Sequence, residues 1–136
     1  MVALDTLAAD VLQEIAASFP GRRVLGAWLY GSHGRGESRA DSDVDIAVLC
    51  DAPLDPVHLF DAAGRLGTRI GAAVDLVDLR RAGGLLRVEA THRGCVLVPP
   101  TTEASVFVTH ALADYAAFAP RRRAATRAFE EKLRGR

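Results

Sequence analysis

The segment Tyr30-Gly-Ser-His-Gly-Arg-Gly-Glu-Ser-Arg-Ala-Asp-Ser-Asp-Val-Asp-Ile-Ala-Val-Leu49 decides how this chain folds. An apolar run, Arg23–Tyr30, ends at the Gly-Ser pair of this segment, and its composition predicts a buried strand. After ten further residues, a polar and glycine-bearing loop, Asp43-Val44-Asp45 opens a second apolar run that predicts another strand, Val44–Leu49. The segment therefore predicts two strands joined by a loop that has polar groups at both of its ends.

Two carboxylates stand at the start of the second strand. Because successive side chains of a strand point to opposite faces, Asp43 and Asp45 project to the same side. Neighbouring carboxylates repel each other unless a cation relieves the repulsion, and a few hard oxygen ligands suit Mg²⁺. The simpler interpretation is a polar turn in which these acids only cap the loop. The upstream Gly-Ser pair and the strand that follows favour the metal site.

The Gly-Ser pair, Gly31 and Ser32, ends the first strand. Glycine lets the backbone approach a phosphate closely, and a serine hydroxyl or amide can donate to a phosphate oxygen. A plain strand-exit turn is the alternative, because both residue types are common in turns. We predict a phosphate-binding turn from the combination of this pair with the downstream carboxylates.

A third carboxylate is expected if two metal ions or a general base serve the reaction. Asp75 is the leading candidate, because it lies in an apolar, strand-like run where a lone acid is unfavourable unless it is paired or metal-bound. Asp78 lies three residues further along, so in a strand it points to the opposite face, and we expect it to be a strand-end or loop acid. Together with Asp43 and Asp45, Asp75 would complete an acidic cluster for two cations.

Outside this segment the chain alternates helices and strands. Apolar periodicity and the positions of proline and glycine predict helices over Leu4–Phe19, 55–70, Gly83–His92 and from Thr102 onward, and strands over Ala73–Leu79 and Gly94–Val98. Pro120 is expected to kink or divide the last helix. A length of 136 residues suits one domain. We predict an α/β (α+β) fold, a small mixed sheet flanked by helices, with a core over residues 1–100 and a C-terminal helical segment with a basic tail over 101–136 in the same domain.

Charge is unevenly distributed along the chain, although its net charge is zero. Residues 120–136 hold seven basic and two acidic residues, whereas the preceding residues hold ten basic and fifteen acidic ones. The basic tail is interpreted either as a solvated helix end or as a surface for an acidic partner. Without interleaved aromatic residues or a groove-reading motif, nucleic acid is not the expected partner.

The two cysteines, Cys50 and Cys95, match no metal or redox spacing. We expect both to be buried in or beside strands as ordinary apolar residues. Cysteines of this kind fit a reducing cytoplasm. No apolar stretch approaches the ~20 residues that a membrane helix needs, and no basic signal-peptide region opens the sequence. We therefore expect a soluble, cytoplasmic protein.

Residues 30–49 resemble the signature of the nucleotidyltransferase superfamily related to DNA polymerase beta: Gly-Ser, ten residues, then Asp-x-Asp. The short length, Arg35-Gly36 and Ser42-Asp43-Val44-Asp45 resemble its minimal nucleotidyltransferase branch, whose best-understood members are antitoxins paired with HEPN-domain toxins. The order of helices and strands extends the similarity over residues 1–100. The resemblance implies a polymerase beta-like fold. It also implies ATP as the substrate and two Mg²⁺ ions as the cofactor.

The resemblance also implies a reaction and a partner. AMP would pass to a tyrosine hydroxyl of the partner toxin, an RNase, which is thereby silenced within a hetero-oligomer. Metal binding and catalysis would fall to Asp43, Asp45 and Asp75. Nucleotide binding would fall to Gly31, Ser32 and Ser42. His33 is expected to be a loop residue and not a catalyst. Arg35 and Arg39 are close enough in the loop to contact phosphates, but we expect them to be solvated.

Two alternatives to this enzyme remain open. The chain could be a binding module that neutralises its toxin by contact alone, with a vestigial acidic cluster. The presence of all three carboxylates favours the enzyme, since a decayed site would have lost at least one of them. Transfer to a small molecule such as an aminoglycoside is the other alternative, but the 36 residues after Pro100 leave little room for a substrate domain.

Overall fold

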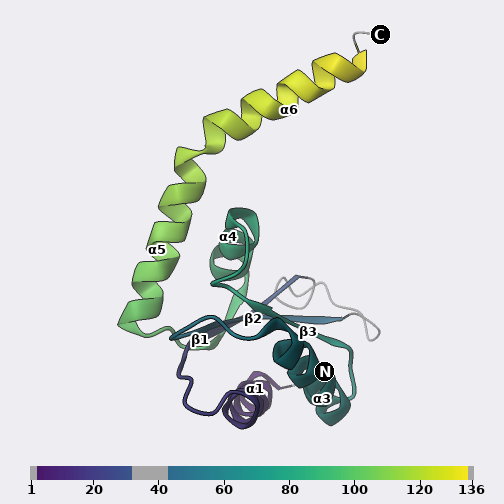
Figure 1. Cartoon of the computed structure of the whole chain (residues 1–136), viewed down its shortest axis with the longest axis vertical. Coiled ribbons are helices and arrows are strands. Elements are labelled where there is room, and N and C mark those ends of the chain that lie inside the picture. The colour runs from purple at the N-terminus through teal and green to yellow at the C-terminus, as the bar shows by residue number, and fades with distance from the viewer. Residues whose placement is uncertain (1–2, 32–42, 135–136) are drawn as a thin grey trace.

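The computed structural model describes residues 3–31 and 43–134, except for the side chains of residues 119 and 122. Its elements follow the predicted alternation of helices and strands (Figure 1). In chain order they are α1 (Leu4–Ser18), β1 (Val24–Tyr30), β2 (Val44–Cys50), α3 (Pro56–Ile70), β3 (Val74–Asp78), α4 (Gly84–Arg93), β4 (Cys95–Val98), α5 (Thr102–Ala117) and α6 (Ala119–Arg134).

The four strands form one mixed sheet in the order β3-β2-β1-β4. β1 is antiparallel to both β2 and β4, whereas β2 and β3 are parallel because α3 connects them as a crossover. Helices α1 and α3 cover one face of the sheet, and α4 and α5 cover the other (Figure 1). The prediction of a small mixed sheet flanked by helices is confirmed, and β3 lies at an edge of this sheet.

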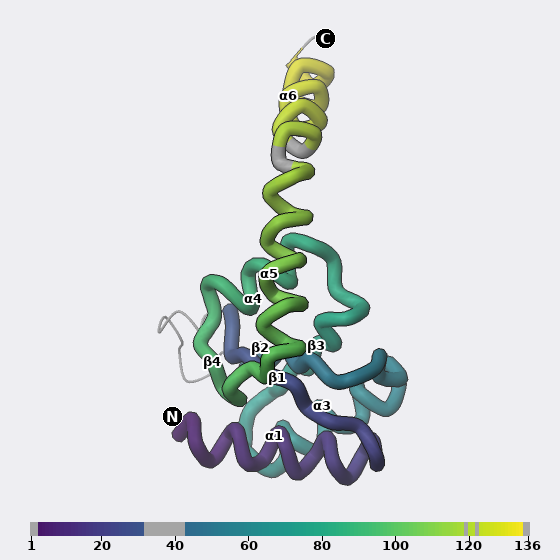
Figure 2. The backbone as a smooth tube through the Cα atoms, turned by 90° about the vertical axis from the view of Figure 1, so that its left-hand side faces the viewer, coloured from purple at the N-terminus to yellow at the C-terminus, as the bar shows by residue number. Residues whose placement is uncertain are grey.

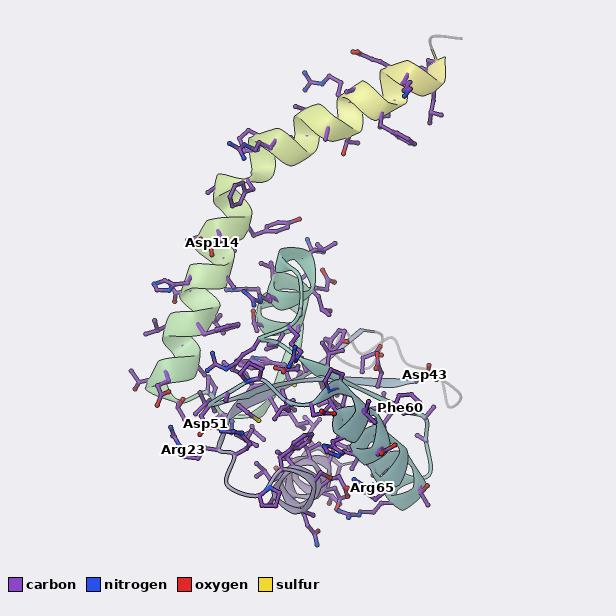
Figure 3. The ribbon with its side chains drawn as sticks, viewed as in Figure 1. Arg23, Asp43, Asp51, Phe60, Arg65 and Asp114 are labelled. Atoms are coloured by element: carbon purple, nitrogen blue, oxygen red, sulfur yellow. The ribbon has the colours of Figure 1, made fainter. Side chains whose placement is uncertain are left out.

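The layer of α1 and α3 is held by apolar packing and by an ionic cluster around the buried carboxylate of Glu14. Leu7, Val11 and Ile15 of α1 recur on one face of the helix and are buried against the sheet. Among them lies Glu14, whose carboxylate accepts hydrogen bonds from Arg65 Nε at 2.6 Å and from an Arg69 Nη atom at 3.1 Å. Figure 3 shows Arg65 on α3 next to α1. This cluster ties the two helices to each other under the sheet.

The ends of α3 follow the signals present in the sequence. Asp55 caps the first turn by accepting hydrogen bonds from the backbone amides of Val57 and His58, and Pro56 occupies the first helical position. A cap of this kind stabilises a helix by about 1 kcal/mol. Gly71 ends the helix in the left-handed conformation, at a φ of 74°. The predicted helix start and stop are both confirmed.

Helix α5 is attached to the body of the protein by two arginines that stack on one ring. The guanidinium groups of Arg80 and Arg87 lie 5.7 and 4.8 Å from the ring centroid of Phe107. Each is anchored by backbone carbonyls, with Arg80 donating to Cys50 O and Arg87 donating to Leu79 O. These arginines therefore serve packing, and they fix α5 beside α4.

The chain then leaves the body. Pro120 lies in the first turn of α6, so the prediction that it divides the last helical segment is confirmed. Helix α6 continues from α5 and projects away from the sheet in both views (Figures 1 and 2). None of the helices in the described part of the chain is both long enough and apolar enough to cross a membrane.

Candidate functional site

Three polar residues lie in one row across three neighbouring strands. Tyr30 of β1 pairs with Asp45 of β2, and Asp45 pairs with Asp75 of β3. Side chains of directly paired residues project to the same face of a sheet, and here it is the face covered by α4 and α5, where Tyr30 and Ala47 are buried. The structure thus brings together two of the three predicted carboxylates, which are thirty residues apart in the sequence.

The third predicted carboxylate, Asp43, lies immediately before β2 and is exposed to solvent. Figure 3 shows it where β2 begins. Its position two residues before Asp45 places it on the same side of the chain as the row. Within residues 3–31 and 43–134, however, no three His, Cys, Asp or Glu side chains are close enough together to hold a metal ion. The structure therefore places Asp45 beside Asp75, but Asp43 does not lie close enough to complete a group of three ligands among the described residues.

The backbone of Gly31 passes close to the carboxylate of Asp45 in the row. Its φ of 67° is in the left-handed region, which favours glycine. A Cβ atom built on Gly31 would overlap the carboxylate of Asp45. Position 31 therefore requires glycine for its backbone conformation and for the space that the carboxylate occupies. The other predicted nucleotide contacts, Ser32 and Ser42, lie outside the described residues, as do His33, Arg35 and Arg39.

Tyr30 reports the electrostatics of the site. Burial and, after it, the negative charges of Asp45 and Asp75 raise the pKa of the Tyr30 hydroxyl to about 12. The hydroxyl is therefore protonated at neutral pH and can act as a donor, and both carboxylates lie close enough to influence it. Sequence reasoning missed Tyr30, although its position directly before Gly31 at the end of a strand was a usable signal.

The reason given for choosing Asp75 was wrong. Asp75 is exposed, because β3 is an edge strand and its face is not covered at this point. The buried acid of this strand is Asp78, which is 4% exposed and accepts hydrogen bonds from the amides of Leu54 at 2.8 Å and Arg80 at 3.0 Å. These bonds hold the connection that follows β2 and the turn that follows β3, so Asp78 is a structural strand-end acid, as predicted. Asp75 remains the candidate for chemistry because of its place in the row.

The row has the donor chemistry of a divalent cation site. Carboxylate oxygens are hard ligands that suit Mg²⁺, which also takes phosphate oxygens. Gly31 leaves the backbone open beside Asp45, where a larger residue would fill the space. The residues present could therefore hold a metal–phosphate group, with Asp45 and Asp75 as candidate ligands from adjacent strands and Asp43 two residues before Asp45.

Comparison with protein families gives a match over residues 12–102 to the model described as "Polymerase beta, Nucleotidyltransferase". The chain belongs to this family. The match includes β1 and β2, which flank the Gly-Ser and Asp-x-Asp segment, and β3, which carries Asp75. The resemblance of residues 30–49 to the polymerase beta nucleotidyltransferases is therefore confirmed.

Individual relatives and solved structures show which kinds of family member this chain is similar to. The protein adenylyltransferase MntA of Shewanella oneidensis is 32% identical over 88 residues, which are 65% of this chain and 63% of that protein. The matched region thus spans less than two thirds of that relative's length. A chain from a crystal structure of a toxin–antitoxin with AMP-PNP is 25% identical with a TM-score of 0.79, over 90% of this chain and 98% of that one.

A further solved structure shares the fold of this nucleotidyltransferase. That structure is of a tri-AMPylated HEPN toxin of Shewanella oneidensis in complex with an MNT antitoxin. One of its chains matches this chain with a TM-score of 0.75 at 23% identity, over 94% of this chain and 99% of that one. These likenesses confirm the predicted polymerase beta-like nucleotidyltransferase fold.

Proposed function

We propose that this chain is a nucleotidyltransferase that moves AMP from ATP to a tyrosine hydroxyl of a cognate HEPN-type RNase toxin, and that it thereby acts as the antitoxin. The observation that carries the proposal is the row of Tyr30, Asp45 and Asp75, with Gly31 packed against Asp45. The relative named a protein adenylyltransferase and the structures with AMP-PNP and an AMPylated toxin support the same reaction for this chain. The cytoplasm is the proposed location, since ATP and RNA occur there together.

Magnesium is the proposed cofactor, with Asp43, Asp45 and Asp75 as the residues that would hold it, as two ions. A bound divalent metal offsets the charge of the triphosphate and of the departing pyrophosphate. The carboxylates themselves supply hard oxygen donors, and their mutual repulsion favours cation binding. Because Asp43 precedes the first residue of β2 and is exposed, its side chain has room to approach the row when the cation and nucleotide bind.

The roles of the protein groups follow from their places. Gly31 lets the backbone approach the phosphates, and Ser32 and Ser42 are proposed to donate to them. Asp75 is proposed to take the proton of the accepting tyrosine, whose pKa near 10 makes it a weak nucleophile at neutral pH. The phenol oxygen then forms a bond to the α-phosphorus while the bond from that phosphorus to pyrophosphate breaks. The exposure of Asp75 at a sheet edge supports access by a hydroxyl on another protein.

The proposal is tested by incubating the chain with ATP labelled at the α-phosphate, Mg²⁺ and the purified HEPN toxin encoded beside it. Label is expected on a toxin tyrosine, and toxin RNase activity is expected to fall in step with labelling. Asp75→Asn should abolish labelling, whereas Asp61→Asn, which alters an exposed acid on α3, should leave it unchanged. Unlabelled but neutralised toxin would reject the enzyme.

Neutralisation by contact alone is the second candidate, and helix α6 is the observation that favours it. This helix projects from the body, carries most of the basic residues of the tail, and exposes Phe129 and Leu133, at 63% and 61%. Such a surface suits an acidic protein partner. Neutralisation that survives Asp43→Ala with Asp45→Ala and is lost after changes to α6 would support this second function.

A further inference from the structure

We propose that Arg93, at the end of α4, binds the β- and γ-phosphates of ATP and stabilises the pyrophosphate that leaves. This inference rests on the proposed function and goes beyond it, because it assigns the leaving-group side of the site to a residue outside the Gly-Ser and Asp-x-Asp segment. The chemical class of the ligand is a polyphosphate chain with its divalent cation.

The backbone fixes Arg93 beside the end of β1. Arg93 is the last residue of α4, and Cys95, two residues later, pairs with Leu29 of β1. Gly94 lies between them, and a Cβ atom built on it would be 2.8 Å from the carbonyl oxygen of Leu29. Leu29 is two residues before Gly31, the start of the proposed phosphate turn. The end of α4 therefore lies next to the strand end that carries this turn.

The spacing along α4 places Arg93 on the side of this helix that faces away from α5. Arg87 marks the α5 side, because its guanidinium group stacks on the ring of Phe107. Glu89 follows Arg87 by two residues, which is about 200° around a helix of 3.6 residues per turn. Arg93 follows Glu89 by four residues and shares its side, and the two side chains form an ion pair at 3.5 Å.

The side of α4 that faces away from α5 is the side of the row. Helix α5 joins the sheet near the start of β1, where the amide of Thr101 donates to the carbonyl oxygen of Leu25. Tyr30 and the rest of the row lie at the opposite end of β1, on the face of the sheet that α4 and α5 cover. Figure 1 shows α4 upright on this face with α5 on one side of it. A guanidinium group on the other side of α4 is therefore directed toward the end of the sheet that carries the row.

The other seven arginines of residues 3–31 and 43–118 make their contacts elsewhere. Two precede β1 and pair with Asp51, two pair with Glu14 under the opposite face of the sheet, and three donate to main-chain carbonyls. The side chain of Arg93 is 73% exposed. Within these residues, Arg93 is therefore the arginine whose charge is available to a ligand at the row.

A polyphosphate at this place needs a positive charge. The row is acidic, and the end of α4 presents the negative end of the helix dipole. A guanidinium group offsets both effects and donates two parallel hydrogen bonds to phosphate oxygens. An exposed pair such as Arg93 with Glu89 contributes little to stability, so a phosphate can replace the carboxylate at little cost. A donor already in place would also stabilise the negative charge that grows on the departing pyrophosphate.

The test measures binding to the chain alone, with Mg²⁺ and an ATP analogue that has a methylene group between the α- and β-phosphates and so cannot transfer AMP. Arg93→Gln should raise the Kd of this analogue by about tenfold or more, the effect of losing a hydrogen bond to a charged group. The Kd of AMP should not change, because AMP lacks the β- and γ-phosphates. Arg93→Lys should recover part of the affinity, since it keeps the charge but not the paired donation.

Arg22→Gln is the matched control, because Arg22 is also an exposed arginine in an ion pair with a carboxylate and lies before the opposite end of β1. It should leave both Kd values unchanged. An unchanged Kd of the analogue in Arg93→Gln would overturn the assignment. An equal loss of affinity for the analogue and for AMP would also overturn it, because that is the pattern of a purely structural role at the end of α4.

Transfer to the toxin separates this inference from the proposed function. With Arg93→Gln, the KM for ATP should rise and kcat should fall, since the group acts on bound ATP and on the departing pyrophosphate. Equal labelling kinetics of Arg93→Gln and the unaltered chain would overturn the inference and leave the transfer of AMP established. Absence of label with the unaltered chain would overturn the proposed function, whereas the Kd values would still decide whether Arg93 binds the phosphates.

Discussion

Gly31 packs against the carboxylate of Asp45 so closely that a Cβ atom at position 31 would overlap it. The turn that follows β1 and the candidate ligand on β2 therefore pack directly against each other, so a change in one displaces the other. Any side chain at position 31 would have to displace the carboxylate, and it would also have to adopt a φ of 67°. This relationship explains in physical terms why the two halves of the Gly-Ser and Asp-x-Asp motif occur together.

Gly31→Ala should therefore reduce AMP transfer by at least about 100-fold, the effect of losing roughly 2.7 kcal/mol of transition-state stabilisation. The left-handed conformation of alanine should lower the free energy of unfolding by about 1–2 kcal/mol. Gly21→Ala is the matched control, because Gly21 has a φ of 86° and no neighbour within 4 Å of a Cβ atom. It should lose similar stability and keep full activity. Equal activities of the two variants, measured as labelled toxin, would contradict the packing argument.

The two acids of β3 should separate stability from activity. Asp78→Asn replaces a carboxylate that accepts from two backbone amides, so the free energy of unfolding in urea should fall by about 1–3 kcal/mol. Asp75→Asn should change stability by no more than about 0.5 kcal/mol, because the residue is exposed, and it should abolish transfer. The reverse pattern would mean that the buried acid carries the chemistry.

The fold and the site were predictable from sequence to different degrees. Caps such as Asp55 and Gly71 act over a few residues, so helix ends could be predicted correctly. The pairing of Asp45 with Asp75 depends on the order of strands, which the local pattern does not contain. The same limit explains the error about Asp75: an apolar run predicts a strand, but it does not tell an edge strand from a central one. Tyr30 was missed because its role depends on the pairing of strands across the loop.

Tyr30 should make stability fall in alkali. Its folded pKa of about 12 exceeds the unfolded value of 10, so its contribution is fully present below pH 10 and is lost as pH rises toward 12. The loss amounts to roughly 2–3 kcal/mol at about 1.36 kcal/mol for each pKa unit. Tyr30→Phe should lack this part of the decline when unfolding is measured from pH 9 to pH 12 in metal-free buffer. Cys50, whose pKa burial raises to about 11, contributes equally to both proteins and cancels in the comparison. Parallel curves for the two proteins would contradict the shift.

The ionic cluster of Glu14 should stabilise the fold without entering the reaction. Glu14→Gln keeps the shape of the side chain but weakens the bonds from Arg65 and Arg69, so the free energy of unfolding should fall by about 1–3 kcal/mol. Transfer by the folded protein should be unchanged, since the cluster lies on the face of the sheet opposite the row. A loss of transfer larger than the loss of folded protein would show that α1 and α3 also position the site.

The central claim is that the row built around Asp45 catalyses transfer of AMP to the toxin. The most direct measurement compares the unaltered chain with Asp45→Asn, each mixed with the HEPN toxin, Mg²⁺ and ATP labelled at the α-phosphate, with labelled tyrosine identified by mass spectrometry. We predict label on a toxin tyrosine with the unaltered chain and none with Asp45→Asn, while circular dichroism shows both proteins folded. Equal labelling by the two proteins, or a silenced toxin that carries no AMP, would contradict the account.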